Sequence, residues 1–262
     1  MFEFLFDYSL YIAGPAIIGI LCAFAICGLM VVRRFVLPRL TIRIEDSEFS
    51  GAMVQGVIVF YGLALGLIAV NVFQTYDDTI KIITAEATAL NVLYRDVTSY
   101  PDPIRTDLQR ELREYTEYVI HEAWPLQRQG KLPSGGVEHM SKFQAMLDKF
   151  EPATEGQKLL HGETLRAYNQ LIQARRQRLD AVTNGLPTVM WIVIVVGAFI
   201  SLITCFFFSV EDPYLHGILV TLLAIFIGLV IFMTLALDRP FRGDIGLGSE
   251  PFQLVYEQLM KP

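Results

Sequence analysis

The sequence predicts an all-α membrane protein with four transmembrane helices and a helical extramembrane domain inserted between spans 2 and 3. The chain is 53% hydrophobic and only 18% charged, with a mean hydropathy of +0.44, which is too apolar for an ordinary soluble domain. Four stretches lack Asp, Glu, Lys and Arg over about 20 residues, the length that a helix needs to cross a bilayer. Between the second and third stretches, apolar residues recur at three- and four-residue steps, as they do in helices.

The four charge-free stretches define the predicted spans, which are residues 10–32, 51–73, 186–210 and 214–237. The charged residues before the first span are both acidic, Glu3 and Asp7. The span is also longer than the apolar region of a signal peptide, so we expect an uncleaved anchor. The three cysteines (Cys22, Cys27 and Cys205) lie inside these stretches and are expected to be small buried apolar residues. The predicted organisation is a transmembrane hairpin over 1–73, a stalk domain over 74–185, a second hairpin over 186–237 and a tail over 238–262.

Helical periodicity continues through the predicted stalk domain. The expected segments are a stripe over 83–97, a turn at 100–103, a stripe over 104–119, an exposed loop over 130–136, a short helix over 137–150 and a long helix after Pro152. No strong breaker separates Phe73 from Ile83, so the second span is expected to leave the membrane as one continuous helix. The long helix is expected to enter the third span similarly, with Gly185 and Pro187 as a kink.

The arginines give the orientation. Arg33, Arg34, Arg39 and Arg43 follow the first span, whereas no basic residue precedes it. Because positive residues near spans favour the cytoplasmic side, the termini and the helical domain are predicted on the outer, periplasmic side of a bacterial inner membrane. The competing signal comes from basic residues elsewhere, namely Arg175, Arg176, Arg178, Arg239, Arg242 and Lys261.

No feature of the sequence predicts an enzyme, a metal site or a cofactor. The net charge of −6 argues against a nucleic-acid partner, which requires a basic surface. The four histidines (His121, His139, His161 and His216) show no metal-binding spacing, and surface or capping roles are expected for them. The glycine-rich segment 243–248 follows a membrane helix rather than a strand, so it is interpreted as a flexible tail rather than as a phosphate loop.

The second span is the most informative membrane helix. At about 100° per residue, Gln55, Val59, Gly62, Gly66, Phe73 and Asp77 fall along one side, and Phe60, Leu67, Asn71 and Asp78 lie roughly opposite. One interpretation is close helix packing at the two glycines. The other is that several copies of this helix surround a pore. The pore-lining candidates are Gln55, Val59, Phe60, Gly62, Gly66, Asn71, Gln74, Asp77 and Asp78.

Two further inferences concern charge. The spans contain no charged side chain, which argues against a proton-coupled transporter but not against a channel. If the stalk is antiparallel, Glu86 lies at a height comparable to that of Arg175 and Arg178, and an ion pair with either arginine is expected.

Several short motifs together resemble the bestrophin-like domain family of bacterial membrane proteins. They are Val32-Arg33-Arg34 to Pro38-Arg39, the glycine-containing second span, Glu86-Ala87 to Ala89-Leu90, Leu93-Tyr94-Arg95, Tyr115 to Trp124 with Glu122 and Ala123, Arg178-Leu179 to Leu186-Pro187 and Trp191, and Leu237-Asp238-Arg239-Pro240-Phe241 with Gly243 and Pro251-Phe252. The resemblance covers nearly the whole chain. It implies a distant similarity to bestrophins, which are pentameric ion channels, usually for anions, with a pore lined by the second transmembrane helix.

The sequence departs from bestrophins in three respects. Bestrophins hold their helical domain in the cytosol, whereas the arginines here favour the opposite side. The chain lacks a run of acidic ligands for the calcium clasp of animal bestrophins. Asp77 and Asp78 near a pore mouth would favour cations rather than anions.

The leading hypothesis is a homo-oligomeric ion channel, pentameric by resemblance, with inorganic ions and the lipid bilayer as its partners. The alternative is a membrane-anchored scaffold or signalling protein whose helical domain binds a partner protein. The oligomeric state separates the two, because one pore helix per subunit requires a ring.

Overall fold

The computed structural model describes residues 10–39, 44–207 and 212–261; for residues 44–50 it describes the backbone alone. The chain divides into two compact units. Unit 1 comprises Met1–Thr75 and Gly185–Asp238, and unit 2 comprises Tyr76–Asn184 and Arg239–Pro262. Unit 2 therefore takes in the C-terminal segment as well as the region between the second and third apolar stretches.

Unit 1 is built from four apolar helices. They are α1 (Leu10–Val31), the N-terminal part of α2 (Ile44–Val97), α7 (Thr188–Phe206) and α8 (Pro213–Asp238), and the π-helical turn η2 (Val32–Val36) and the 3-10 turn η3 (Leu37–Arg39) follow α1. Within the described residues, four helical segments are long and apolar enough to cross a membrane. The prediction of a multi-pass, all-α membrane protein is confirmed. Of the predicted third span, residues 208–210 lie outside the described residues.

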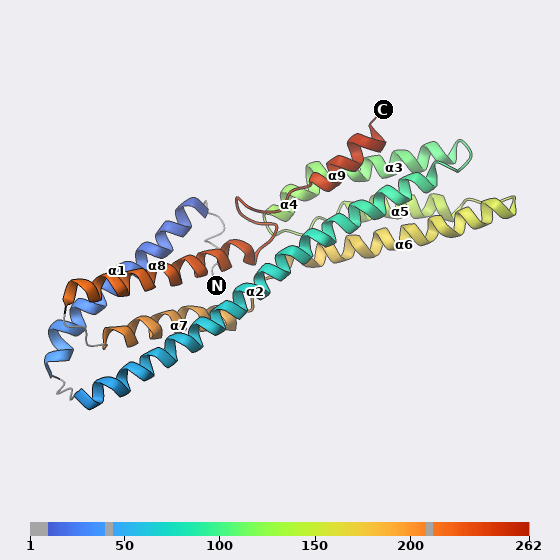
Figure 1. Ribbon diagram of the computed structural model, residues 1–262. Coiled ribbons are helices and arrows are strands. Elements are labelled where there is room, and N and C mark those ends of the chain that lie inside the picture. The colour runs from blue at the N-terminus through green and yellow to red at the C-terminus, as the bar shows by residue number, and fades with distance from the viewer. Residues whose placement is uncertain (1–9, 40–43, 208–211, 262) are drawn as a thin grey trace. The chain divides into compact units, whose positions relative to one another are not determined.

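Small residues allow the helices of unit 1 to approach closely, as is common in membranes. A Cβ atom added at Gly14 would lie 3.0 Å from the Phe232 ring, which places α1 directly against α8, as Figure 1 shows. A Cβ added at Gly197 of α7 would lie 2.5 Å from the Tyr61 ring of α2. The hydroxyl of Tyr61 also donates a hydrogen bond of 2.9 Å to the carbonyl of Ile194. The two contacts of Tyr61 join α2 to α7.

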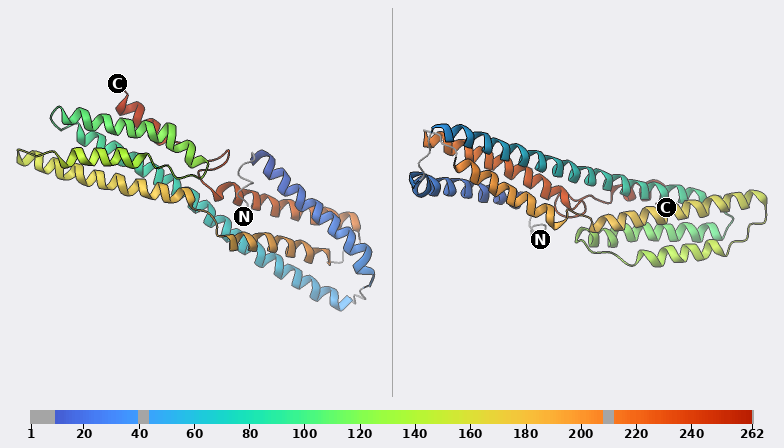
Figure 2. Two further views of the ribbon diagram at one scale, coloured as in Figure 1. Left: turned by 180° about the vertical axis from the view of Figure 1, so that it is seen from behind. Right: turned by 90° about the horizontal axis from the view of Figure 1, so that it is seen from below.

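Unit 2 is a helical bundle with its own core. Its elements are the C-terminal part of α2, α3 (Ile104–Tyr118), η4 (Val119–Ala123), α4 (Trp124–Arg128), α5 (Gly136–Asp148), α6 (Glu155–Thr183), α9 (Glu250–Val255) and η5 (Tyr256–Met260). Figures 1 and 2 show α3, α5 and α6 running alongside the C-terminal part of α2. The helices predicted from the periodicity over 83–97, 104–119, 137–150 and beyond Pro152 are confirmed.

Local chemistry fixes the ends of these helices. The prolines at 101 and 103 separate α2 from α3. Thr154 caps α6, because its hydroxyl accepts a hydrogen bond from the Gln157 amide while the Gln157 side chain accepts one from Thr154. The prediction that the second span continues as one helix is confirmed by α2, which is unbroken over 54 residues.

The expected kink between the long helix and the third span is instead a complete break. α6 ends at Thr183 and α7 begins at Thr188. Pro187 lacks an amide proton and disfavours helical geometry in the residue before it. The freed amide of Leu186 donates to the Asp238 carboxylate at 2.5 Å, which satisfies the backbone at the break within unit 1.

The interpretation of segment 243–248 as a flexible tail is wrong. The carbonyl of Leu247 accepts a hydrogen bond of 3.0 Å from the indole of Trp124, and its amide donates to Pro240 at 2.8 Å. Farther along, Phe252 and Met260 are fully buried in the core of unit 2. The C-terminal segment is therefore part of the bundle.

Candidate functional site

Helix α2 has one buried side and one exposed side along its length. In unit 1, Leu65, Ala69 and Val72 are buried against the other helices. Eight of the nine residues proposed for the pore are exposed on the rest of the helix surface, and the Asp77 side chain is half-exposed. The exposed side is strongly apolar in its membrane part, because Phe60, Leu63, Leu67 and Val70 are all more than half exposed.

Gly62 and Gly66 of the second span have no close neighbour among the described residues. A Cβ atom added at Gly62 or Gly66 would meet nothing within 4 Å in the described structure. Gly28 and Gly197, by contrast, lie directly against the rings of Phe206 and Tyr61. Close packing inside one chain therefore explains Gly28 and Gly197 but not Gly62 or Gly66.

Two of the candidates lie at the edge of the exposed side. Gln55 and Val59 line a groove of about 500 Å³, which they share with His216 and Leu219 of α8. The remaining candidates of the second span, from Phe60 onward, are not among the residues that line this groove. The structure therefore separates Gln55 and Val59, next to α8, from the more open surface formed by Phe60 and the residues after it.

The acidic pair at the end of this surface carries its own counter-ion. Lys81 Nζ lies 2.7 Å from an oxygen of Asp77 and 2.9 Å from an oxygen of Asp78. All three side chains are about half or more exposed, so these ion pairs contribute little stability. Two carboxylates and one ammonium leave one negative charge per chain. Sequence reasoning missed Lys81, although its i+3 and i+4 spacing on a helix was the available signal.

Glu86 and Arg178 meet in the core of unit 2. Arg178 Nε lies 2.5 Å from Glu86 Oε2, and Nη2 lies 3.1 Å from Glu86 Oε1. The two side chains are 0% and 1% exposed. Arg175, the other predicted partner, lies beside Gly136 instead, with its Nη2 3.1 Å from an added Cβ.

Aromatic residues complete the surroundings of this ion pair. The Tyr115 hydroxyl donates to Glu86 Oε1 at 2.8 Å. Burial raises the pKa of Tyr115, so this hydroxyl keeps the proton that it donates. The Arg178 guanidinium lies 5.4 Å from the centre of the Trp124 ring and 5.5 Å from that of Phe252. Sequence reasoning did not predict these three aromatic partners.

Residues 19–252 match the family model for the bestrophin-like domain. The chain belongs to the bestrophin-like family. The match extends over most of both compact units and includes α2, the buried ion pair and more than half of the C-terminal segment. The resemblance inferred from the sequence motifs is confirmed. No curated protein matches the sequence.

Solved structures show the same fold at low identity. A variant of a bacterial bestrophin homologue from Klebsiella pneumoniae superposes with a TM-score of 0.72 at 11% identity, over 95% of this chain and 99% of that one. A second variant of that homologue gives 0.69 at 12% identity, over 97% of both chains. A structure described as a membrane protein variant gives 0.70 at 8% identity, over 94% and 97%. This bestrophin-like chain therefore shares the fold of those proteins over nearly its full length.

Proposed function

We propose that this bestrophin-like protein is a homo-oligomeric ion channel, pentameric by resemblance, whose pore is lined by α2. The observation that carries the proposal is the exposed side of α2, which no other part of the described chain covers in its membrane half. The aligned bestrophin homologue provides a channel-type precedent for the fold. A ring of copies would bring this side of each α2 to a common axis.

The order of residues along α2 fits the parts of a pore. Gly62 and Gly66 provide narrow helix surface, and the exposed Phe60, Leu63 and Leu67 provide apolar side chains that can form a dewetting constriction. Asn71 and Gln74 follow, and then the Asp77, Asp78 and Lys81 group supplies charge at the mouth. Small and apolar residues alternate through the membrane part, polar residues follow and charged residues come last, and this order is the reason to prefer α2 over the other spans.

Unit 2 would then form a vestibule outside the membrane. Its surface carries charged pairs such as Arg110 with Asp107 and Arg166 with Glu163, as a water-facing bundle requires. A separate proposal, which rests on charge bias alone, is that this vestibule lies on the outer, periplasmic face; the arginines after the first span support it.

The test is to reconstitute the purified full-length protein in liposomes and to measure its oligomeric state and ion flux together. We expect a closed ring of several copies and ion flux above that of protein-free vesicles. A monomer or dimer without flux would favour the alternative, a membrane-anchored scaffold whose helical unit binds another protein. A ring without flux across a range of voltage and pH would also contradict the channel.

Replacing Gly66 by Leu tests the exposed side of α2 directly. Because a Cβ atom added at Gly66 meets no described atom within 4 Å, we expect the free energy of unfolding of the protomer to change by at most about 0.5 kcal/mol. Assembly or ion flux should nevertheless be lost, since the leucine would project into the helix interface or the pore. Light scattering and flux assays measure both.

Gly19→Leu is the matched control for this substitution. Gly19 of α1 is also exposed, with no described atom within 4 Å of an added Cβ. We expect this variant to assemble and conduct like the wild type, because α1 does not line the proposed pore. Equal behaviour of the Gly19 and Gly66 variants would argue against α2 as the pore helix.

A further inference from the structure

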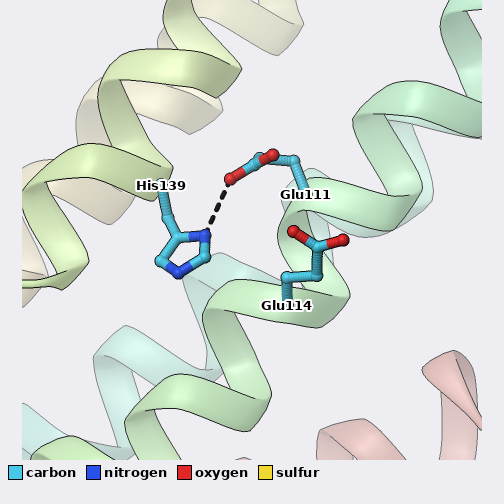
Figure 3. Close-up of side chains that lie close together, drawn as sticks. All are labelled: Glu111, Glu114 and His139. Atoms are coloured by element: carbon cyan, nitrogen blue, oxygen red, sulfur yellow. Dashed lines mark hydrogen bonds and ion pairs between the residues drawn. The ribbon is translucent and has the colours of Figure 1, made fainter.

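Three potential metal ligands come together in unit 2, on two helices that are not part of the proposed pore. Glu111 and Glu114 lie one turn apart on α3, and His139 lies on α5. One ligand atom from each residue lies within 4.8 Å of the other two. Figure 3 shows the imidazole and the two carboxylates lying close together between the helices. The three-residue spacing on α3 places both carboxylates on the side that faces α5.

The three side chains differ in exposure in a way that suits a metal ion. The Glu111 side chain is 9% exposed and that of His139 is 22% exposed, whereas Glu114 is 48% exposed. The buried Glu111 carboxylate needs a compensating positive charge or hydrogen-bond donor. Nδ1 of His139 lies 2.7 Å from Glu111 Oε1 and supplies that donor. The exposed Glu114 leaves an open path for an ion to enter.

Glu114 has no close counter-ion in the described structure. Glu114 Oε1 lies 4.0 Å from Arg110 Nε, and Arg110 lies closer to Asp107, at 2.7 Å. The nearby Lys142 is bonded to Glu138 at 2.7 Å. That hydrogen bond, with smaller contributions from the charges of Glu111 and Glu114, raises the pKa of Lys142. The carboxylates thus outnumber the cations that bind them.

We propose that Glu111, Glu114 and His139 bind a divalent transition-metal ion of the zinc class. One imidazole nitrogen and two carboxylate oxygens, with water as a fourth ligand, make the tetrahedral set that Zn²⁺ accepts. Ca²⁺ and Mg²⁺ prefer six or more oxygen ligands and tolerate nitrogen poorly, so they fit this set less well. The site goes beyond the proposed channel and does not depend on it, since neither α3 nor α5 lines the proposed pore.

Binding requires only small movements. The metal would take the place of the proton between His139 and Glu111, and that proton would leave to solvent. With metal–ligand bonds of about 2.1 Å, adjacent tetrahedral ligands lie about 3.4 Å apart, so the present 2.7 Å contact must widen slightly. Glu114 is exposed and can rotate towards the ion. The bound ion would fasten α3 to α5 more firmly than the hydrogen bond does.

The experiment is a Zn²⁺ titration of the full-length, tag-free protein in detergent, read with a competing zinc-binding dye. We expect one zinc ion per chain in the wild type, and saturating zinc should raise the melting temperature by roughly 5 °C. Glu114→Gln should weaken zinc binding at least about tenfold while leaving the melting temperature of the zinc-free protein unchanged. His139→Gln should weaken binding at least as much.

Matched variants distinguish the site from a plain ion pair and from surface binding. His121→Ala with Glu122→Gln removes an exposed histidine and glutamate outside the cluster, and it should bind zinc like the wild type. If Glu111 and His139 form only an ion pair, Glu114→Gln will have no effect on zinc affinity. That result, or the absence of binding by the wild type below about 100 µM zinc, would overturn the proposal. Calcium or magnesium binding with equal affinity would overturn the zinc-class assignment.

Discussion

Replacing Arg178 by Met is expected to lower the free energy of unfolding by about 3–5 kcal/mol, because it leaves a buried carboxylate without its cation. The Glu86 side chain is 0% exposed. Of the hydrogen bonds that the described residues make to Glu86, the one from the Tyr115 hydroxyl would remain. Methionine keeps apolar contact with Trp124 and Phe252, so the loss reports the missing charge rather than a missing volume.

Thermal unfolding of the purified protein, followed by circular dichroism, measures this effect. For a chain of this size the melting temperature should fall by roughly 10 °C. The double variant Glu86→Met with Arg178→Met should recover most of the loss, because a buried pair can be replaced by apolar residues at little cost. An equal loss in the single and double variants would show that the arginine acts through packing instead.

An exposed ion pair provides the control. Arg166 bonds to Glu163 at 2.8 Å, with both side chains more than 60% exposed. Arg166→Met should therefore change the stability by no more than about 1 kcal/mol. If Arg178→Met costs no more than this control, the buried pair does not hold unit 2 together.

The sequence could predict those parts of the fold that depend on neighbouring residues. The four apolar helices follow from composition and length, and the unbroken α2 follows from the absence of a breaker between Phe73 and Ile83. Helical periodicity similarly located α3, α5 and α6. These signals are local, because each residue's contribution depends on partners three or four positions away.

The parts that the sequence could not predict depend on contacts between distant residues. The break before α7 uses Asp238 to bind the freed Leu186 amide, and these residues are 52 positions apart. The docked C-terminal segment depends on Trp124, which lies 123 positions from Leu247. Periodicity alone could not choose between Arg175 and Arg178 as the partner of Glu86, since they lie about one turn apart on the same helix.

The candidate site shows the same division. Helical geometry could divide the candidates of α2 between two sides, but which residues are exposed could be known only once the other helices were in place. The cluster of Glu111, Glu114 and His139 was missed because α3 and α5 bring its members together from 28 residues apart. The histidine had no ligand at helical spacing in its own segment.

Replacing Asp77 and Asp78 together by Asn is expected to shift the selectivity of the proposed channel strongly towards anions. In the wild type, the two carboxylates and the Lys81 ammonium leave one negative charge per chain. The double variant keeps Lys81 and so carries one positive charge at the same place. In a ring this change of two charges per subunit is repeated around the pore mouth, where it acts on every passing ion.

Reversal potentials in planar bilayers under a tenfold KCl gradient measure the shift. A tenfold ratio is about 1.4 kcal/mol and one charge crossing 100 mV is about 2.3 kcal/mol, so perfect selectivity gives about 60 mV. We expect the double variant to move by about 20 mV or more towards the anion limit. An unchanged reversal potential would remove Asp77 and Asp78 from the pore mouth.

Lys81→Gln is the matched variant with the opposite sign. It removes the ammonium that now lies 2.7 and 2.9 Å from the two carboxylates. The Asp77 and Asp78 pair then contributes two negative charges per chain at this place. The reversal potential should move towards the cation limit. Folding should stay intact, because ion pairs between exposed side chains contribute little stability. Opposite shifts in the two variants are expected if Asp77, Asp78 and Lys81 face the permeating ions. Shifts of the same sign would instead indicate a change in pore shape.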